Sequence, residues 1–264
     1  MAKTKFKRIF RCIVTGLIGS VLFCGAAVWA QPRPVVTEAL AHAHDAGLSE
    51  SLISRVLAMV YDAGFDPASA ARTLTVLAKA HQKGFELQPF RDRIDEGIAK
   101  RIEGARIARA LEERLNRQIL VSERLPDGRD MAASIYQAAV ASLADGLEMG
   151  LTPSEIDTLL QQTGDAPLAM TAVAAEMWAL LKQLAFAPDL THQIIAEGLA
   201  QQSLNPAWRH FPQIVVIARQ KGVPDEETGG EALKRLQAGG VPADLLTRLG
   251  FTGRNLRTGP RGKD

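Results

Sequence analysis

Three carboxylates that share one local pattern are the residues of this chain whose type and spacing could do chemistry. Glu96, Asp145 and Glu197 each precede a glycine and a branched aliphatic residue. Paired carboxylates carry out acid–base and glycosidic chemistry in enzymes. The pattern therefore permits an enzymatic hypothesis, a hydrolase or lytic enzyme that acts on cell-wall glycan.

A structural role explains the same acids more simply. A carboxylate on one helix can accept hydrogen bonds from the free amide end of a neighbouring helix, and an adjacent glycine lets the two backbones approach. A glycan hydrolase would also use aromatic platforms for sugar rings, and the chain has only two tyrosines and three tryptophans. We predict no catalytic residue, and we interpret six residues as structural repeat positions: Glu96, Gly97, Asp145, Gly146, Glu197 and Gly198.

The histidines do not follow a metal-binding pattern. His42 and His44 are two residues apart, so on a helix their side chains point about 200° away from each other and cannot share one ion. His81, His192 and His210 have no carboxylate or histidine partner at ligand spacing. The sequence also lacks a glycine-rich phosphate loop after a strand, a G-x-S-x-G elbow and an H-E-x-x-H helix. We expect no metal and no cofactor.

The first 30 residues have the composition of a secretory signal peptide. A basic start from Lys3 to Arg11 precedes an apolar run from Ile13 to Val28, and Val28-Trp29-Ala30 places small residues where signal peptidase reads. We predict cleavage after Ala30 and export to the periplasm or envelope. An uncleaved membrane anchor is the alternative, since a run of this length can just span a bilayer. Lipidation at Cys24 is a third possibility, which the bulky Phe23 disfavours.

Removal of this segment changes the charge of the chain. It holds five of the 31 Lys+Arg and none of the 29 Asp+Glu, so 26 basic and 29 acidic residues remain and the net charge is near −3. No basic excess is left to bind nucleic acid. Cys12 and Cys24 also leave with the segment, which excludes disulfides, cysteine-ligated metals and thiol nucleophiles from the mature chain.

The rest of the chain has helical periodicity. Apolar residues between Ser49 and Ala63 fall on one stripe of a helix. Strand-like alternation is almost absent, and aromatic residues make up only 5% of the chain. We predict a long surface helix over 103–122 with one buried stripe, and a helix over 167–186 that its neighbours surround. The β-branched run 213–218 leads into a helix ending and is predicted to be helical.

Glycine–proline corners separate the predicted helices. Glycine takes the left-handed conformation that ends a helix, the next apolar residue folds back, and proline suits the first position of the following helix. Asp66, Thr152 or Asn205 can cap that helix, and Thr152 with Glu155 predicts a capping box. The predicted corners are Gly47, Gly64, Pro67, Gly84, Gly150, Pro153, Pro206, Gly222, Pro224, Gly240 and Pro242.

Short helices on short corners predict an all-α fold, either an irregular multi-helix bundle or a short superhelix of degenerate helix-turn-helix repeats. The three acid–glycine pairs give repeat distances of 49 and then 52 residues, from position 96 to 145 and from 145 to 197. The predicted organisation is a signal peptide over 1–30, an extended leader over 31–36, an all-helical domain over 37–251 and a flexible basic tail over 252–264.

The runs Glu96-Gly97-Ile98-Ala99-Lys100 and Asp145-Gly146-Leu147-Glu148-Met149-Gly150-Leu151 resemble a known phrase. It is the repeated E-G-L-A-K-G-V-P of a group of exported bacterial proteins that have no assigned function. The resemblance covers about 83–107 and 145–156, and Arg101 stands where the phrase has glycine. It implies a bacterial envelope protein with a helical fold, and it implies no site residue.

The leading hypothesis from the sequence is a non-enzymatic, exported helical repeat protein that binds another envelope protein or serves as a scaffold. The first alternative is the glycan hydrolase that uses Glu96, Asp145 or Glu197. The second is a membrane-tethered assembly helper, which requires that the N-terminal segment be retained.

Overall fold

A computed structural model describes residues 34–62, 65–125 and 132–250 of the 264-residue chain. The predicted signal peptide, the predicted tail over 252–264 and the corner glycine Gly64 lie outside these residues. Within them every regular element is a helix, which confirms the all-α prediction. The elements are α1 (Pro34–Asp45), α2 (Glu50–Asp62), α3 (Pro67–Gln82), α4 (Gln88–Ala99), α5 (Gly104–Ser122), α6 (Ala133–Glu148), α7 (Pro153–Thr163), α8 (Leu168–Gln183), α9 (Pro188–Ala200), the 3-10 helix η2 (Pro206–His210), α10 (Phe211–Gln220), α11 (Asp225–Gln237) and α12 (Ala243–Arg248).

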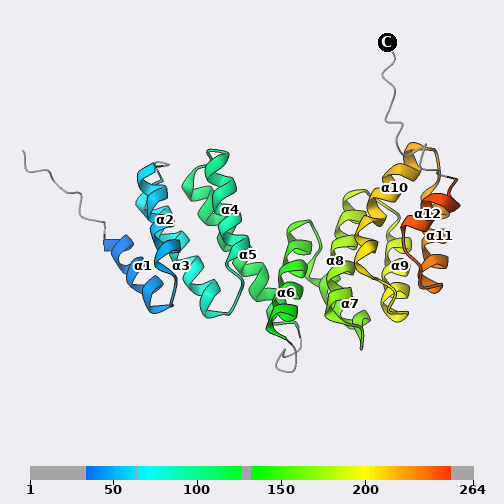
Figure 1. The fold of residues 1–264 in the computed structure, drawn as a ribbon, viewed down its shortest axis with the longest axis horizontal. Coiled ribbons are helices and arrows are strands. Elements are labelled where there is room, and N and C mark those ends of the chain that lie inside the picture. Colours follow the sequence, from blue (N-terminus) through cyan, green and yellow to red (C-terminus); the bar gives the residue numbers. More distant parts are fainter. Residues whose placement is uncertain (1–33, 63–64, 126–131, 251–264) are drawn as a thin grey trace, which may run out of the picture.

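The helices stand in two rows. In the first row α1, α3, α5, α6 and α8 pack side by side in this order, and α8 also contacts η2 and α10. In the second row α7, α9 and α11 pack on one another, and an ion pair of 2.6 Å between Arg55 and Asp95 ties α2 to α4. Figure 1 shows the helices following one another in chain order along the longest axis, from α1 at one end to α12 near the other. The described chain is therefore an elongated array of helix pairs.

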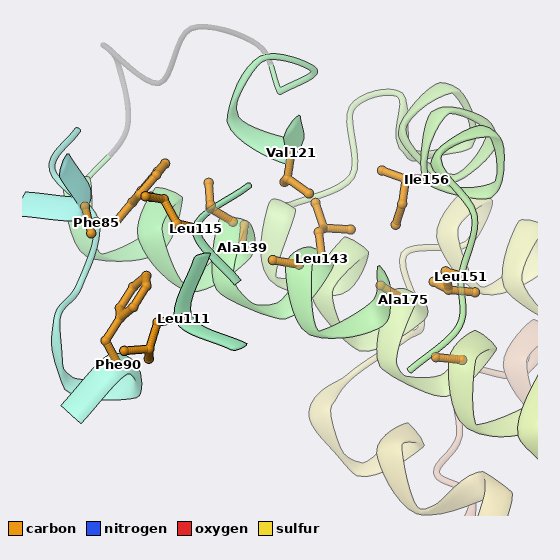
Figure 2. Close-up of a cluster of buried hydrophobic side chains, with 14 of the residues drawn as sticks. Phe85, Phe90, Leu111, Leu115, Val121, Ala139, Leu143, Leu151, Ile156 and Ala175 are labelled. Carbon is orange, nitrogen blue, oxygen red and sulfur yellow. The ribbon is translucent and has the colours of Figure 1, made fainter. Parts of the chain in front are cut away.

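The apolar core runs without interruption along this array. Figure 2 shows it passing from Phe90 on α4 through Leu111 and Leu115 on α5 to Leu143 on α6 and Ile156 on α7. None of these five side chains is more than 3% exposed. Burying a side chain of this size stabilises a fold by roughly 1.5–3 kcal/mol, so this core is a main source of the stability of the array.

The two long helices differ in burial as predicted. Helix α5 buries one stripe that includes Ile107, Leu111 and Leu115. Helix α8 buries ten of its 16 residues, so its neighbours surround it on most sides. It ends at Gln183, three residues before the predicted end, because Phe186 belongs to the next corner and folds back into the core. The β-branched run 213–218 lies inside α10, as predicted.

The extended leader predicted over 31–36 is wrong for its last three residues. Helix α1 begins at Pro34, while residues 31–33 lie outside the described part of the chain. Proline is well suited to the first position of a helix, because the N–H that it lacks would have no partner there. Val36 and Ala39 are each 6% exposed, so burial of one face of α1 holds this first turn in the array.

Several predicted corners carry the expected caps. The Asp66 side chain accepts a hydrogen bond from the Ser69 N–H at 2.9 Å, and the first residue of α3 is the predicted corner residue Pro67. Thr152 and Glu155 form the capping box at the start of α7. The corners at Pro224 and Pro242 differ, since these prolines precede α11 and α12 instead of opening them.

Eight of the described helices end in the same motif. A residue in the left-handed conformation follows the last turn, and the N–H of the next residue donates to the carbonyl five positions earlier. This bond satisfies one of the carbonyls that a helix end leaves free. At the last of these ends the left-handed residue is Gly239, and the predicted corner residue Gly240 follows it. The left-handed residues are Gly47, Gly84, Arg101, Gly150, Ala185, Gln202, Gly222 and Gly239.

The number of residues in one helix pair differs from the spacing of the three acids. The apolar residues that follow the ends of α2, α4, α6, α8 and α10 are Phe65, Ile102, Leu151, Phe186 and Val223, at steps of 37, 49, 35 and 37 residues. A helix pair therefore takes 35–37 residues. The longer step spans α5 and α6, the only consecutive α-helices before α10 that lie in the same row of the described array.

Candidate functional site

The three acids lie at the same place in their helices. Each stands four residues before the residue that caps the helix end, and its carbonyl accepts a 2.9 Å hydrogen bond from that residue's N–H. They are thus at the carbonyl end of their own helix, where the helix dipole disfavours negative charge. The interpretation that they bind the amide end of a neighbouring helix is wrong. The helices are α4 for Glu96, α6 for Asp145 and α9 for Glu197.

These acids do not come together. Helices α4, α6 and α9 lie at successive places along the molecule (Figure 1). Glu96 pairs with Lys100 one turn later on its own helix, and Asp145 pairs with Arg114 on α5. The Glu197 side chain forms no ion pair or hydrogen bond with any described residue. The arrangement therefore builds no two-carboxylate site from them.

The glycines beside the acids make room for apolar side chains. A Cβ at Gly97 would lie 2.4 Å from Cδ1 of Ile107, and one at Gly198 would lie 2.5 Å from Cγ of Leu204. Both distances are shorter than real Cβ contacts allow. The acid–glycine pattern thus marks a helix end against which the following segment packs closely, and it recurs in both rows of the array.

A cluster of charged residues is the strongest candidate site in the described chain. Glu148 on α6 accepts hydrogen bonds from Arg93 on α4 at 2.6 Å and from Arg117 on α5 at 2.7 Å. Asp145, one turn before it, accepts a bond from Arg114 at 2.9 Å. Arg114 also lies 3.9 Å from Glu148. Three helices thus bring three cations and two anions together.

Arg114 is the buried member of the cluster. Its side chain is 7% exposed, against 48% for Asp145 and 31% for Glu148. Its guanidinium carbon lies 5.9 Å from the centre of the Phe90 ring, within the range of a cation–π contact. The Nε atoms of Arg114 and Arg117 and the Oε1 of Gln118 are buried without a hydrogen-bond partner. A buried polar atom without a partner costs about 1–3 kcal/mol, so this cluster is incompletely satisfied.

The cluster keeps Glu148 ionised. Burial alone would raise the pKa of this carboxyl group, but the hydrogen bond from Arg93 and the charges of Arg93, Arg117 and Arg114 outweigh it. The pKa of Glu148 is therefore lowered from its ordinary value of 4.5. A carboxyl group with a lowered pKa is a poor proton donor near neutral pH. The cluster has the chemistry of a structural ion network and not of a general acid.

The histidines lie apart from this cluster. His44 Nδ1 stands 3.2 Å from Glu50 across the corner between α1 and α2, and the His192 ring meets the Trp178 ring edge-on at 4.8 Å. Among the described residues, no group of three or more His, Cys, Asp or Glu is arranged to hold a metal ion. None of the described helices combines the length and the apolar character that a membrane crossing requires.

Sequence reasoning missed two kinds of residue. Arg114 falls between Leu111 and Leu115 on the stripe predicted to be buried, and a charge on a buried stripe is the signal that could have identified it. The second kind donates a hydrogen bond to a carbonyl at the helix end of a neighbouring pair. Gln183 Nε2 donates to the Met149 carbonyl at 2.9 Å, and Arg219 donates to the Leu184 carbonyl at 2.6 Å. No local pattern indicates which corner such a side chain reaches.

Three comparisons with known proteins gave no match to this chain, whether to a family model, to a curated protein or to a solved structure.

Proposed function

We propose that this protein is an exported scaffold or protein-binding module of the bacterial envelope, built from stacked helix pairs. The observation that carries the proposal is the elongated two-row array, in which the helices follow one another in chain order and pack on their neighbours along the molecule. Arrays of this kind offer extended surfaces to protein partners. The basic and apolar start of the chain, over 1–30, supports export.

The use of the polar residues supports a binding role over a catalytic one. Charged side chains join one helix to another, as in Arg72 with Glu112 between α3 and α5 and Lys182 with Glu155 between α8 and α7. The acids that suggested glycan chemistry stand singly on three separate helices. The proposed partner is another envelope protein, which would dock through apolar anchors with a polar rim.

Site-specific photo-crosslinking in cells tests this proposal. A photoreactive amino acid is placed in turn at Asn116 on α5, Gln161 on α7 and Gln220 on α10, three exposed positions along the array. We expect one envelope protein to be captured from a subset of these positions, and the purified pair to bind with an affinity that a charge introduced at the captured position weakens. Capture of every abundant protein from all three positions, or of this chain alone, would contradict the proposal.

The hydrolase alternative has a separate test. The purified chain and a variant with Glu96→Gln, Asp145→Asn and Glu197→Gln are incubated with peptidoglycan, and soluble fragments are measured. A scaffold releases none in either form. Release by the natural chain that the triple variant loses would establish the hydrolase instead.

The membrane-tethered alternative depends on the N-terminus. Sequencing of the exported protein should give Gln31 as its first residue if the predicted cleavage after Ala30 occurs. A retained Met1 on a membrane-bound protein would favour the tethered helper.

A further inference from the structure

The array changes its pattern between α5 and α6. These helices follow each other in the chain and lie side by side in the first row, with no second-row helix between them. They run antiparallel, because Tyr136 near the start of α6 donates to the carbonyl of Ser122 at the end of α5, whereas Asp145 near the end of α6 meets Arg114. We call residues 34–125 the first block and residues 132–250 the second block.

All ion pairs between described residues of the two blocks gather at this hairpin. Four come from the cluster around Asp145 and Glu148, and the fifth, between Arg124 and Asp157, lies at the end of α5 with a distance of 2.9 Å. The next contact along the first row, between α6 and α8, has no ion pair among the described residues and packs small side chains such as Ala175 beneath the end of α6. The connection between the blocks is thus more charged than its neighbour.

Three of the nine buried polar side-chain atoms that lack a partner among the described residues lie at the hairpin. The Nε atoms of Arg114 and Arg117 and the Oε1 of Gln118 are unpaired, and all three residues are on α5. Each block has a separate supply of apolar contacts, for example around Leu77 in the first and Met177 in the second, both fully buried. The hairpin therefore joins the blocks through charge as well as through the continuous apolar core.

We propose that the α5–α6 hairpin is a joint between two stable blocks, which the ion cluster holds closed through Asp145 and Glu148 and which loosens when Glu148 loses its charge. The groups that face these carboxylates are Arg93 from α4 and Arg114 and Arg117 from α5. Loss of the Glu148 charge would leave Arg93 and Arg117 without their shared carboxylate and would remove one of the two counter-ions of the buried Arg114, which is unfavourable. The apolar contacts of Leu115 and Leu143 shown in Figure 2 remain, so the joint bends and does not separate.

The pKa of Glu148 sets the pH range in which the cluster is formed. The pKa of Glu148 is lowered in the folded chain, so the cluster is fully formed above the ordinary value of 4.5 and is lost as the pH falls through the lower folded value. The joint is therefore expected to loosen in acid and at high salt, which screens the more exposed pairs. This inference does not rest on the proposed function.

Distances between spin labels test the joint in the full chain with Cys12→Ser and Cys24→Ser. One label pair spans the blocks, at Lys79→Cys on α3 and Gln220→Cys on α10, and a reference pair within the first block uses Lys79→Cys and Ser54→Cys. As the pH is lowered stepwise from about 7 to about 2, the distance distribution between blocks should broaden at a pH below the ordinary carboxyl pKa. The reference distribution and the helical circular dichroism should be unchanged.

A charge-removing variant separates the joint from general acid unfolding. Glu148→Gln should broaden the distribution between blocks at neutral pH, because it removes the carboxylate shared by Arg93 and Arg117. The matched control is Glu112→Gln, which breaks an ion pair with Arg72 inside the first block and should leave the distribution between blocks as it was. The proposal is wrong if Glu148→Gln leaves the distribution unchanged, or if helicity is lost at the same pH at which the distribution broadens.

Discussion

At the scale of single residues, the helix ends explain why glycine recurs in this sequence and where it is not needed. Five of the eight left-handed residues are glycine, but Arg101, Ala185 and Gln202 occupy the same conformation with φ of 54°, 49° and 49°. Arg101 stands where the resembling phrase has glycine, and the helix nevertheless ends there. The left-handed conformation costs a non-glycine residue roughly 1–2 kcal/mol, so the surrounding packing imposes these turns.

Exchanging residues between two such corners should change stability in opposite directions. Gly150→Ala should lower the free energy of unfolding by about 1 kcal/mol, because a Cβ there meets nothing within 4 Å and only the backbone conformation, with φ of 111°, opposes it. Ala185→Gly should raise it by up to about 1 kcal/mol, since the strain is released. Urea unfolding measures both, and a destabilising Ala185→Gly would contradict the left-handed assignment.

A second prediction concerns Gly97, the glycine beside Glu96, against which Ile107 packs closely. Gly97→Ala should destabilise the chain by about 1–3 kcal/mol, because its Cβ would overlap Cδ1 and Cγ1 of Ile107 at 2.4 and 2.7 Å. In the background of Ile107→Ala, which removes both atoms, the same change should cost less. The control is Gly230→Ala on α11, where a Cβ meets nothing within 4 Å and a better helix former should stabilise by up to about 1 kcal/mol. Equal effects at positions 97 and 230 would contradict the packing.

At the scale of elements, the helices and many of their ends could be predicted, because apolar stripes, caps and left-handed glycines are local signals. The row of a helix could not be predicted in this way. The acid–glycine pattern occurs on α4 and α9 in the second row and on α6 in the first, so its spacing of 49 and 52 residues mixes two positions of the repeat. The candidate cluster was missed for a related reason, since its members come from three helices.

Bonds from one helix pair to the corner of the preceding pair hold neighbouring repeats in register. Arg219 on α10 shows this most clearly: it donates to the carbonyls of Leu184 and Ala185 and forms a two-point ion pair with Asp225 at the start of α11. Gln183 on α8 reaches the Met149 carbonyl at the end of α6 in the same way. Side chains thus complete helix ends that the backbone leaves partly open.

Arg219→Gln should therefore destabilise the chain by about 0.5–1.5 kcal/mol, because exposed hydrogen bonds are lost that water replaces only in part. Lys221 is exposed two residues later at the same helix end, and its side chain forms no bond with a described residue, so Lys221→Gln should stay within about 0.5 kcal/mol of the natural chain. Thermal unfolding of the two variants measures the difference. Equal midpoints would show that the bonds between pairs contribute nothing.

At the scale of the whole molecule, carboxylates tied to cations make the array sensitive to acid. Burial would raise the pKa of Glu155, but the hydrogen bonds from Lys182 and Thr152 outweigh it, and the pKa is lowered from 4.5 as it is for Glu148. A lowered folded pKa means that the stabilisation is complete above 4.5 and is lost as the pH falls through the lower value. The free energy of unfolding should thus be nearly flat from pH 7 to about pH 5 and should decrease below it. A maximum of stability at about pH 4, measured by urea unfolding, would contradict the sign.

The proposed binding surface and the joint both depend on the elongated array that the stacked helix pairs form. Small-angle X-ray scattering of a chain limited to residues 34–250 tests it most directly. We predict an asymmetric pair-distance distribution and a radius of gyration clearly above the about 17 Å of a compact fold of this length. A symmetric distribution with a radius of about 17 Å would contradict the account.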